Sequence, residues 1–252
     1  MGLGLGIVNE PLEYPVAWIP NEEGLDSNLI LWLQGNVGVS GSGWADSSSE
    51  GNDATQSLVG NRPTLTNHQG NDVLDFDQSG VPQFMDFPKI TIDEDQTFTL
   101  AFAIHLDDMT NRVILSDSGN EFIEILNSKK FRIKTNDPSN LTTVLTNIEP
   151  AFKTSTGIIV CLTRNTIGRF AWRINGEIVP YDTSLSVNQL NTGGFDLQNL
   201  CIRNDNDRAL DGRLFELLFY RGIDLDADEN FSKLVNLHRY LEEKFNIQDV
   251  AI

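Results

Sequence analysis

Carboxylates are the most abundant groups in this sequence that could do acid–base chemistry, with 36 Asp and Glu among 252 residues. A retaining glycosidase needs two of them about 5 Å apart on one surface. Glu121 and Glu124 stand three residues apart in an apolar segment typical of a strand, so their side chains should point to opposite faces. Asp93, Glu94 and Asp95 form a cluster typical of a solvated turn. Neither group predicts a catalytic pair.

The three histidines, His68, His105 and His238, do not fit a nucleophilic or zinc site. None of them stands beside a Ser or Cys in a recognisable nucleophile elbow. Zinc prefers clustered Cys and His side chains, which this sequence lacks. Together with the carboxylate spacing, these observations predict a protein that is not an enzyme.

Calcium is the one metal ion that the loops of this sequence could hold, because it accepts oxygen ligands from irregular segments. Two sets of aspartates are candidates: Asp46, Asp53 and Asp77, or Asp205, Asp207 and Asp211. Neither set has the spacing of an EF-hand. The alternative is that these carboxylates stabilise turns, as Asp often does in loops. No other cofactor is predicted.

A long polar loop, residues 35–60, surrounds a single tryptophan, and long irregular loops in compact domains are usually functional. Glycan binding needs an aromatic platform beside planar polar groups. Trp44 is the candidate platform, and the polar partners near it are Asp46, Asn52 and Asp53. The alternative is that Trp44 closes the end of a sandwich and is buried.

The net charge of −18 excludes some partners. Such a surface repels phosphate backbones, so the sequence predicts no nucleic-acid partner. No stretch reaches the roughly 18 apolar residues of a membrane span, and no membrane partner is predicted. Cys161 and Cys201 lie inside predicted strands and are expected to be buried free thiols.

The main domain, residues 28–252, shows about a dozen short apolar segments bounded by turn residues, a pattern typical of an antiparallel sandwich or jelly roll. Leu29–Leu33 is the first predicted strand. Val73–Phe76 and Phe84–Phe87 are expected to pair around an intervening turn. Asn175-Gly176 is the strongest short-range hairpin signal. The predicted fold class is therefore all-β.

The segment Arg213–Phe245 predicts a strand followed by the single C-terminal helix. Arg213–Tyr220 is an apolar run suited to a strand covered on both faces, and its lone carboxylate, Glu216, is expected to bond a loop or the helix. Asp226 and Glu229 have the spacing of a capping box, which predicts a helix over residues 226–245. Its expected apolar stripe is Phe231, Leu234, Val235, His238, Leu241 and Phe245. This helix is predicted to lie across an edge or end of the sandwich.

Residues 1–27 predict an extended arm, because repeated Gly and Pro prevent a regular element. The arm is too apolar for a solvated linker, so it should dock on its own domain or on a neighbouring subunit. We expect the first ten residues to add to the sheet edge of another chain. The anchoring side chains are expected to be Leu3, Leu5, Ile7, Val8, Tyr14 and Trp18.

Several short motifs together resemble the concanavalin A-like lectin/glucanase (laminin-G-like) jelly roll. They are Leu31-Trp32-Leu33, Trp44-Ala45-Asp46, Gly51-Asn52-Asp53-Ala54, Phe76-Asp77, Asn175-Gly176, Gly212–Tyr220 and Tyr240–Phe245. The combination is most similar to versions found in virion proteins of tailed phages, and the Gly-Leu-Gly-Leu start is similar to structural proteins of marine phages (cyanophage-like). The family's usual Phe-Asp-Gly turn is Phe76-Asp77-Gln78 here, and the Glu-x-Asp-x-x-Glu motif of its glycosidases is absent.

Two functions follow as hypotheses. The resemblance and the apolar arm favour a non-enzymatic structural protein of a phage virion, assembled in the host cytoplasm. It would be an outer-surface capsid decoration protein, bound to the major capsid protein or to tail and fibre subunits, and a homo-oligomer. The alternative is a carbohydrate-binding, lectin-like tail or fibre module that recognises a host-surface glycan through the Trp44 loop.

Overall fold

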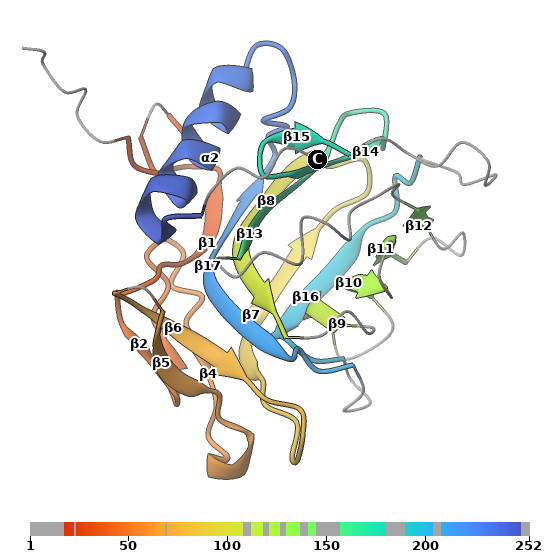
Figure 1. Cartoon of the computed structure of the whole chain (residues 1–252). Coiled ribbons are helices and arrows are strands. Elements are labelled where there is room, and N and C mark those ends of the chain that lie inside the picture. The colour runs from red at the N-terminus through yellow and green to blue at the C-terminus, as the bar shows by residue number, and fades with distance from the viewer. Residues whose placement is uncertain are drawn as a thin grey trace, which may run out of the picture.

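The computed structural model of the protein describes residues 18–22, 24–68, 70–107, 112–117, 121–126, 130–136, 141–144, 157–179, 190–203 and 208–247. Within these residues the chain forms two antiparallel β-sheets, packed face to face, with a single C-terminal helix on the outside (Figure 1). This confirms the predicted all-β sandwich. The same residues contain no helix that is long and apolar enough to cross a membrane.

The first sheet has eight strands, organised around the long strand β17 (Gly212–Arg221). β17 pairs with β8 (Phe98–Leu106) along one side, and with β6 and β1 along the other. The other strands are β1 (Leu29–Leu33), β5 (Thr64–His68), β6 (Asn71–Phe76), β13 (Ile158–Arg164), β14 (Phe170–Ile174) and β15 (Glu177–Ile178). β14 and β15 form the hairpin predicted at Asn175-Gly176, and both turn residues have positive φ as such a turn requires.

The second sheet has nine strands, in the spatial order β12-β11-β10-β9-β16-β7-β4-β3-β2. Their bounds are β2 (Val39–Ser40), β3 (Gly43–Trp44), β4 (Ala54–Thr55), β7 (Met85–Ile92), β9 (Arg112–Ser116), β10 (Phe122–Leu126), β11 (Lys130–Lys134), β12 (Leu141–Val144) and β16 (Phe195–Leu200). The predicted pairing of Val73–Phe76 with Phe84–Phe87 is wrong, because β6 and β7 belong to different sheets. The intervening turn carries the chain from one sheet to the other.

Apolar side chains cover both faces of the first sheet. One cluster fills the space between the two sheets, and the other lies between the first sheet and the helix α2 (Phe231–Phe245). Along β17, Leu217 and Phe219 point into the first cluster, whereas Leu218 and Tyr220 point into the second. The strand is therefore covered on both faces, as predicted. The helix, however, lies over the outer face of the sheet and not across an edge or end (Figure 1).

The helix also begins later than predicted. It starts at Phe231, after an Asn230 N-cap that makes no side-chain capping bond, so the capping box at Asp226 and Glu229 is not used. The buried residues are Leu234, Leu237, Leu241 and Phe245. Phe231 and Val235 of the predicted stripe are 40% and 41% exposed. The buried face of the helix is thus rotated relative to the predicted apolar stripe. It includes Leu237, which the prediction left out, and it excludes Val235 and His238.

Both cysteines are buried free thiols, as predicted. Burial raises the pKa of the Cys161 thiol to about 12, and burial also raises the pKa of the Cys201 thiol well above its usual value. Both thiols therefore stay protonated at neutral pH and act as small apolar groups in the core.

The end of the predicted arm packs on its own domain. The Trp18 ring meets the Tyr240 ring of α2 edge to face, with 6.3 Å between ring centroids. The Tyr220 hydroxyl donates a hydrogen bond of 3.0 Å to the carbonyl oxygen of Pro20. Trp18 thus docks on its own domain, which is one of the two alternatives that the sequence leaves open for the arm. The other predicted anchoring residues (Leu3, Leu5, Ile7, Val8 and Tyr14) lie outside the described residues.

Candidate functional site

Trp44 is part of the core and not of a binding surface. Its side chain is fully buried in the cluster between the sheets, and Nε1 donates a hydrogen bond of 3.0 Å to the carbonyl oxygen of Gln34. A sugar platform needs an exposed ring face, so the expectation that Trp44 stacks on a glycan is corrected. The structure agrees with the alternative prediction, in which Trp44 is buried and closes the sandwich.

The polar partners expected around Trp44 organise the loop itself. Asp46 Oδ1 accepts hydrogen bonds from the Trp32 and Ser48 amides, and Oδ2 accepts from the Asn52 amide and the Ser48 hydroxyl, at 2.7–2.9 Å. Asp53 Oδ1 accepts from the Asp46 amide at 2.8 Å. The Asn52 side chain donates to the Ile30 carbonyl at 2.7 Å. These groups therefore hold the loop against β1.

The calcium candidates do not come together in the described residues. Asp77 caps a turn at the end of β6, where hydrogen bonds from the Ser79 amide and hydroxyl lower the pKa of its carboxyl. Asp211 contacts Arg112 at 3.3 Å, and Asp205 and Asp207 lie outside the described residues. Across the part of the chain that the structure describes, no group of three His, Cys, Asp or Glu side chains is placed to hold a metal ion. Calcium binding stays a prediction.

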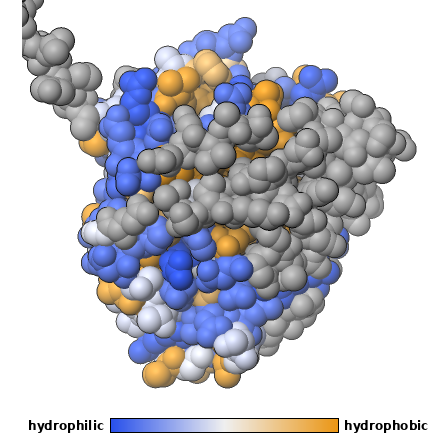
Figure 2. Space-filling view, viewed as in Figure 1, coloured by the Kyte–Doolittle hydropathy of each residue, from blue (hydrophilic) through white to orange (hydrophobic). Residues whose placement is uncertain are grey.

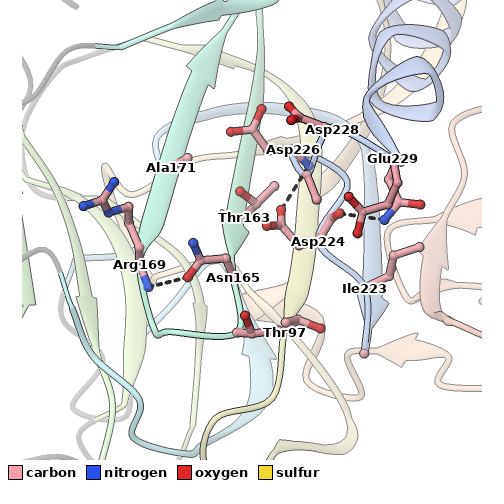
Figure 3. Close-up of a pocket in the computed structure, with 14 residues that line it drawn as sticks. Thr97, Thr163, Asn165, Arg169, Ala171, Ile223, Asp224, Asp226, Asp228 and Glu229 are labelled. Carbon is pink, nitrogen blue, oxygen red and sulfur yellow. Dashed lines mark hydrogen bonds between the residues drawn. The ribbon is translucent and has the colours of Figure 1, made fainter.

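A polar cavity of about 520 Å³ opens on the first sheet, close to the start of the helix (Figure 3). Its wall is formed by the turn at residues 165–169 between β13 and β14, by the connection at residues 222–230 between β17 and α2, and by Thr97 before β8. Thr163 of β13 and Ala171 of β14 complete the lining. Its volume lies in the range of small-ligand sites, roughly 300–1,000 Å³. This cavity is the candidate site.

Backbone geometry fixes the two loops that form the wall. Asn165 Oδ1 accepts hydrogen bonds from the Ile167 and Arg169 amides at 3.1 and 2.9 Å, which closes the turn. Gly222 has a φ of 76° and its amide donates 2.8 Å to the Thr97 carbonyl, so the second loop is tied to the sheet at its first residue. A glycine is favoured there because other residues rarely adopt this backbone conformation.

Carboxylates dominate the cavity. Asp224 accepts a hydrogen bond of 3.0 Å from the Asp226 amide, and burial raises the pKa of its carboxyl, against hydrogen bonds that include one from Thr163. Asp226 pairs with Arg173 of β14 through two nitrogens at 2.7 and 2.8 Å. Asp228 and Glu229 are exposed on the same loop (Figure 3). Four carboxylates and one guanidinium, that of Arg169, therefore line this cavity, and the excess of acidic groups disfavours anions and suits hydroxyl or ammonium groups.

The sequence pattern predicts another role for part of this site. The spacing of Asp226 and Glu229 predicts a capping box, but the two side chains line the cavity instead. A signal for the site does exist in the sequence, since Asp224–Glu229 places four acids in six residues directly after a buried strand. The partner strand that supplies Arg173 and Ala171 is more than fifty residues earlier in the chain, and no local pattern connects the two segments.

We expect the raised pKa of Asp224 to make stability depend on pH. Folding favours the protonated carboxyl, so this contribution is fully present below the unfolded-state pKa and is lost as the pH rises through the folded-state pKa. Asp224→Asn should therefore unfold at a higher urea concentration than the wild type at pH 7. The gain in the free energy of unfolding should be less than about 1 kcal/mol, because the group is partly exposed. The difference should shrink towards pH 4. Asp228→Asn, on the exposed rim, controls for the loss of one charge; an equal effect of both substitutions would contradict this assignment.

No protein-family model and no curated protein sequence matches this chain. Several solved structures share its fold. The binding domain of Paraclostridial Mosquitocidal Protein 1 is 14% identical with a TM-score of 0.59, and the match covers 84% of this chain and 52% of that one. The binding domain of botulinum neurotoxin DC, in complex with rat synaptotagmin II, is 16% identical with a TM-score of 0.54, covering 86% and 53%. The binding domain of botulinum neurotoxin serotype D is 14% identical with a TM-score of 0.54, covering 84% and 52%.

The chain thus spans about half the length of the solved chains that it matches. At this level of identity the likeness establishes the sandwich fold alone. The neighbours are binding domains of toxins and not virion proteins, so the resemblance to phage decoration proteins gains no support from them. All three are described as binding domains.

Proposed function

We propose that this protein is a non-enzymatic binding module that recognises a cell-surface glycan in the cavity beside residues 222–230. The observation that carries the proposal is the polar cavity of about 520 Å³, which is large enough for one or two sugar units. Its carboxylate oxygens and the side chains of Asn165, Thr97 and Thr163 can accept or donate hydrogen bonds to sugar hydroxyl groups.

The fold supports this proposal over the virion hypothesis. The structural neighbours are named as binding domains, and one of them is solved with rat synaptotagmin II. A sandwich that presents loops from a rigid scaffold suits recognition, because the scaffold holds the loop side chains in place before the ligand arrives. The carboxylates also set the ligand class, since they favour neutral or amino sugars over sialylated and sulfated ones.

A glycan array with the intact protein tests this proposal. We expect binding to a subset of neutral or amino glycans, and a loss of at least tenfold in affinity for Ala171→Phe. This substitution places a ring inside the cavity without removing a charge, because Ala171 lines the wall on β14. Gln198→Phe, on a partly exposed position of β16, is the matched control and should bind as the wild type does.

Two results would contradict the proposal. One is the absence of any glycan signal from the folded wild-type protein. The other is unchanged binding by Ala171→Phe, which would place the glycan elsewhere on the molecule. Thermal unfolding of both variants shows whether a lost signal reflects the cavity or a loss of folded protein.

A further inference from the structure

Three exposed aliphatic side chains gather at one end of the molecule. Leu58 and Val59 are 62% and 77% exposed in the loop that follows β4, and Val81 is 57% exposed in the connection between β6 and β7. We call these three residues the apolar tip. Figure 2 shows orange, hydrophobic surface at this end, at the bottom of the view. Single exposed aliphatic residues are common, whereas a group on neighbouring loops marks an interaction site.

Hydrogen bonds hold the two loops of the tip together. The Asn61 side chain donates 2.8 Å to the Pro82 carbonyl, and the Phe84 amide donates 3.0 Å to the Asn61 carbonyl. The Gln56 side chain donates 3.2 Å to the Phe84 carbonyl. The apolar tip is therefore presented by a fixed framework, and binding needs little ordering of the loops.

The charge around the tip differs from that of the rest of the chain. Residues 54–71 and 78–85 contain no Asp or Glu, although the chain carries 36 of them. Arg62 is the only Lys or Arg in the same two segments. Its guanidinium donates to the carbonyl oxygens of Gln56 and Ser57 at 2.9 and 3.1 Å, which fixes the positive charge just behind Leu58 and Val59.

We propose that the apolar tip inserts into the surface of a lipid bilayer. Transfer of aliphatic side chains from water to the acyl region lowers the free energy of the system. Arg62, behind these side chains, would then lie at the level of anionic headgroups. The two tip loops carry no acid within residues 54–71 and 78–85, and the carboxylates of Asp77 and Asp86 lie at the ends of the second loop. The rest of the −18 charge is screened beyond about 8 Å at physiological salt. A second copy across a twofold axis fits less well, because it would bring two Arg62 groups together. This surface contact differs from a membrane span and does not depend on the glycan proposal.

Sedimentation with lipid vesicles tests the proposal on the full chain. We expect the wild type to pellet with phosphatidylcholine vesicles, and more strongly when phosphatidylserine is added. The double variant Leu58→Ser/Val59→Ser should lower the partition coefficient at least about tenfold. Arg62→Gln should remove only the gain from phosphatidylserine. The matched control is Ile167→Ser/Ile178→Ser, which removes two aliphatic residues of 59% and 53% exposure away from the tip.

Three outcomes would overturn the proposal: no pelleting of the wild type above a vesicle-free sample, equal binding by the tip variant, or an equal loss in the control variant. Sedimentation velocity without lipid tests whether a second copy of this chain occupies the apolar tip instead. A dimer that disappears in Leu58→Ser/Val59→Ser would make the tip a contact between copies and not a lipid-binding element.

Discussion

Replacing Glu216 with alanine is expected to lower the free energy of unfolding by about 3–5 kcal/mol, the cost of leaving buried charged and polar partners without their acceptor. Glu216 is fully buried on β17. One carboxylate oxygen accepts from Trp32 Nε1 at 2.7 Å and from the Tyr240 hydroxyl at 2.8 Å. The other accepts from the Gly35 amide at 3.1 Å and from Lys244 Nζ at 2.6 Å. The carboxylate thus joins the loop after β1 to the helix.

Urea unfolding followed by circular dichroism measures this effect, and the melting temperature should fall by about 10 °C for a domain of this size. Glu177→Ala is the matched control, because Glu177 is exposed on the short edge strand β15 and its loss should cost less than about 0.5 kcal/mol. Glu216→Gln, which keeps one acceptor oxygen, should fall between the two. A loss below about 1 kcal/mol for Glu216→Ala would show that water replaces the carboxylate and that the cluster is not structurally important.

Glu216 and its strand are features that the local sequence determines. Period and composition predicted that Arg213–Tyr220 is a strand buried on both faces, since a run without alternation leaves no polar side for water. A carboxylate in such a run must find partners, so the expectation that Glu216 bonds a loop or the helix followed, and it bonds both. The hairpin at Asn175-Gly176 was equally accessible, because its signal is local and depends on positive φ alone.

Features that depend on distant segments were missed. Asp226 and Glu229 have a capping spacing, yet Asp226 pairs with Arg173, 53 positions earlier in the chain, and the helix starts five residues later than predicted. A charged pair between this loop and β14 outweighs a capping preference of about 1 kcal/mol. β6 and β7 look like a hairpin in sequence, but the pattern of apolar residues does not say which of two sheets a strand joins. The cavity at residues 222–230 could not be seen for the same reason.

The polar composition of the Trp44 loop led to a wrong prediction about the exposure of the Trp44 ring. Ser, Asn, Asp and Gly surround this tryptophan, and such a neighbourhood suggested an exposed ring. The polar side chains instead bond to one another and to the backbone of β1, and this leaves the ring free to pack between the sheets. A polar loop can thus enclose an apolar anchor when its hydrogen bonds are satisfied internally.

Trp44→Ala is therefore expected to behave as a core mutation and to cost about 3–5 kcal/mol of stability. The side chain is fully buried, so its removal leaves a cavity between the sheets and frees the Gln34 carbonyl from the 3.0 Å hydrogen bond to Nε1. Trp44→Phe should recover most of the loss, since it refills much of the volume without the donor. Thermal and urea unfolding measure both variants.

Trp18→Ala is the control for removing an indole, because Trp18 is only partly buried beside Tyr240 and its loss should cost less. Glycan binding, measured well below the melting temperature, then separates the two roles of Trp44. If Trp44 is only a core residue, any Trp44→Ala protein that stays folded should still bind the glycan in the cavity at residues 222–230. Normal stability with abolished binding would instead return Trp44 to the role of a sugar platform and would contradict the buried position described above.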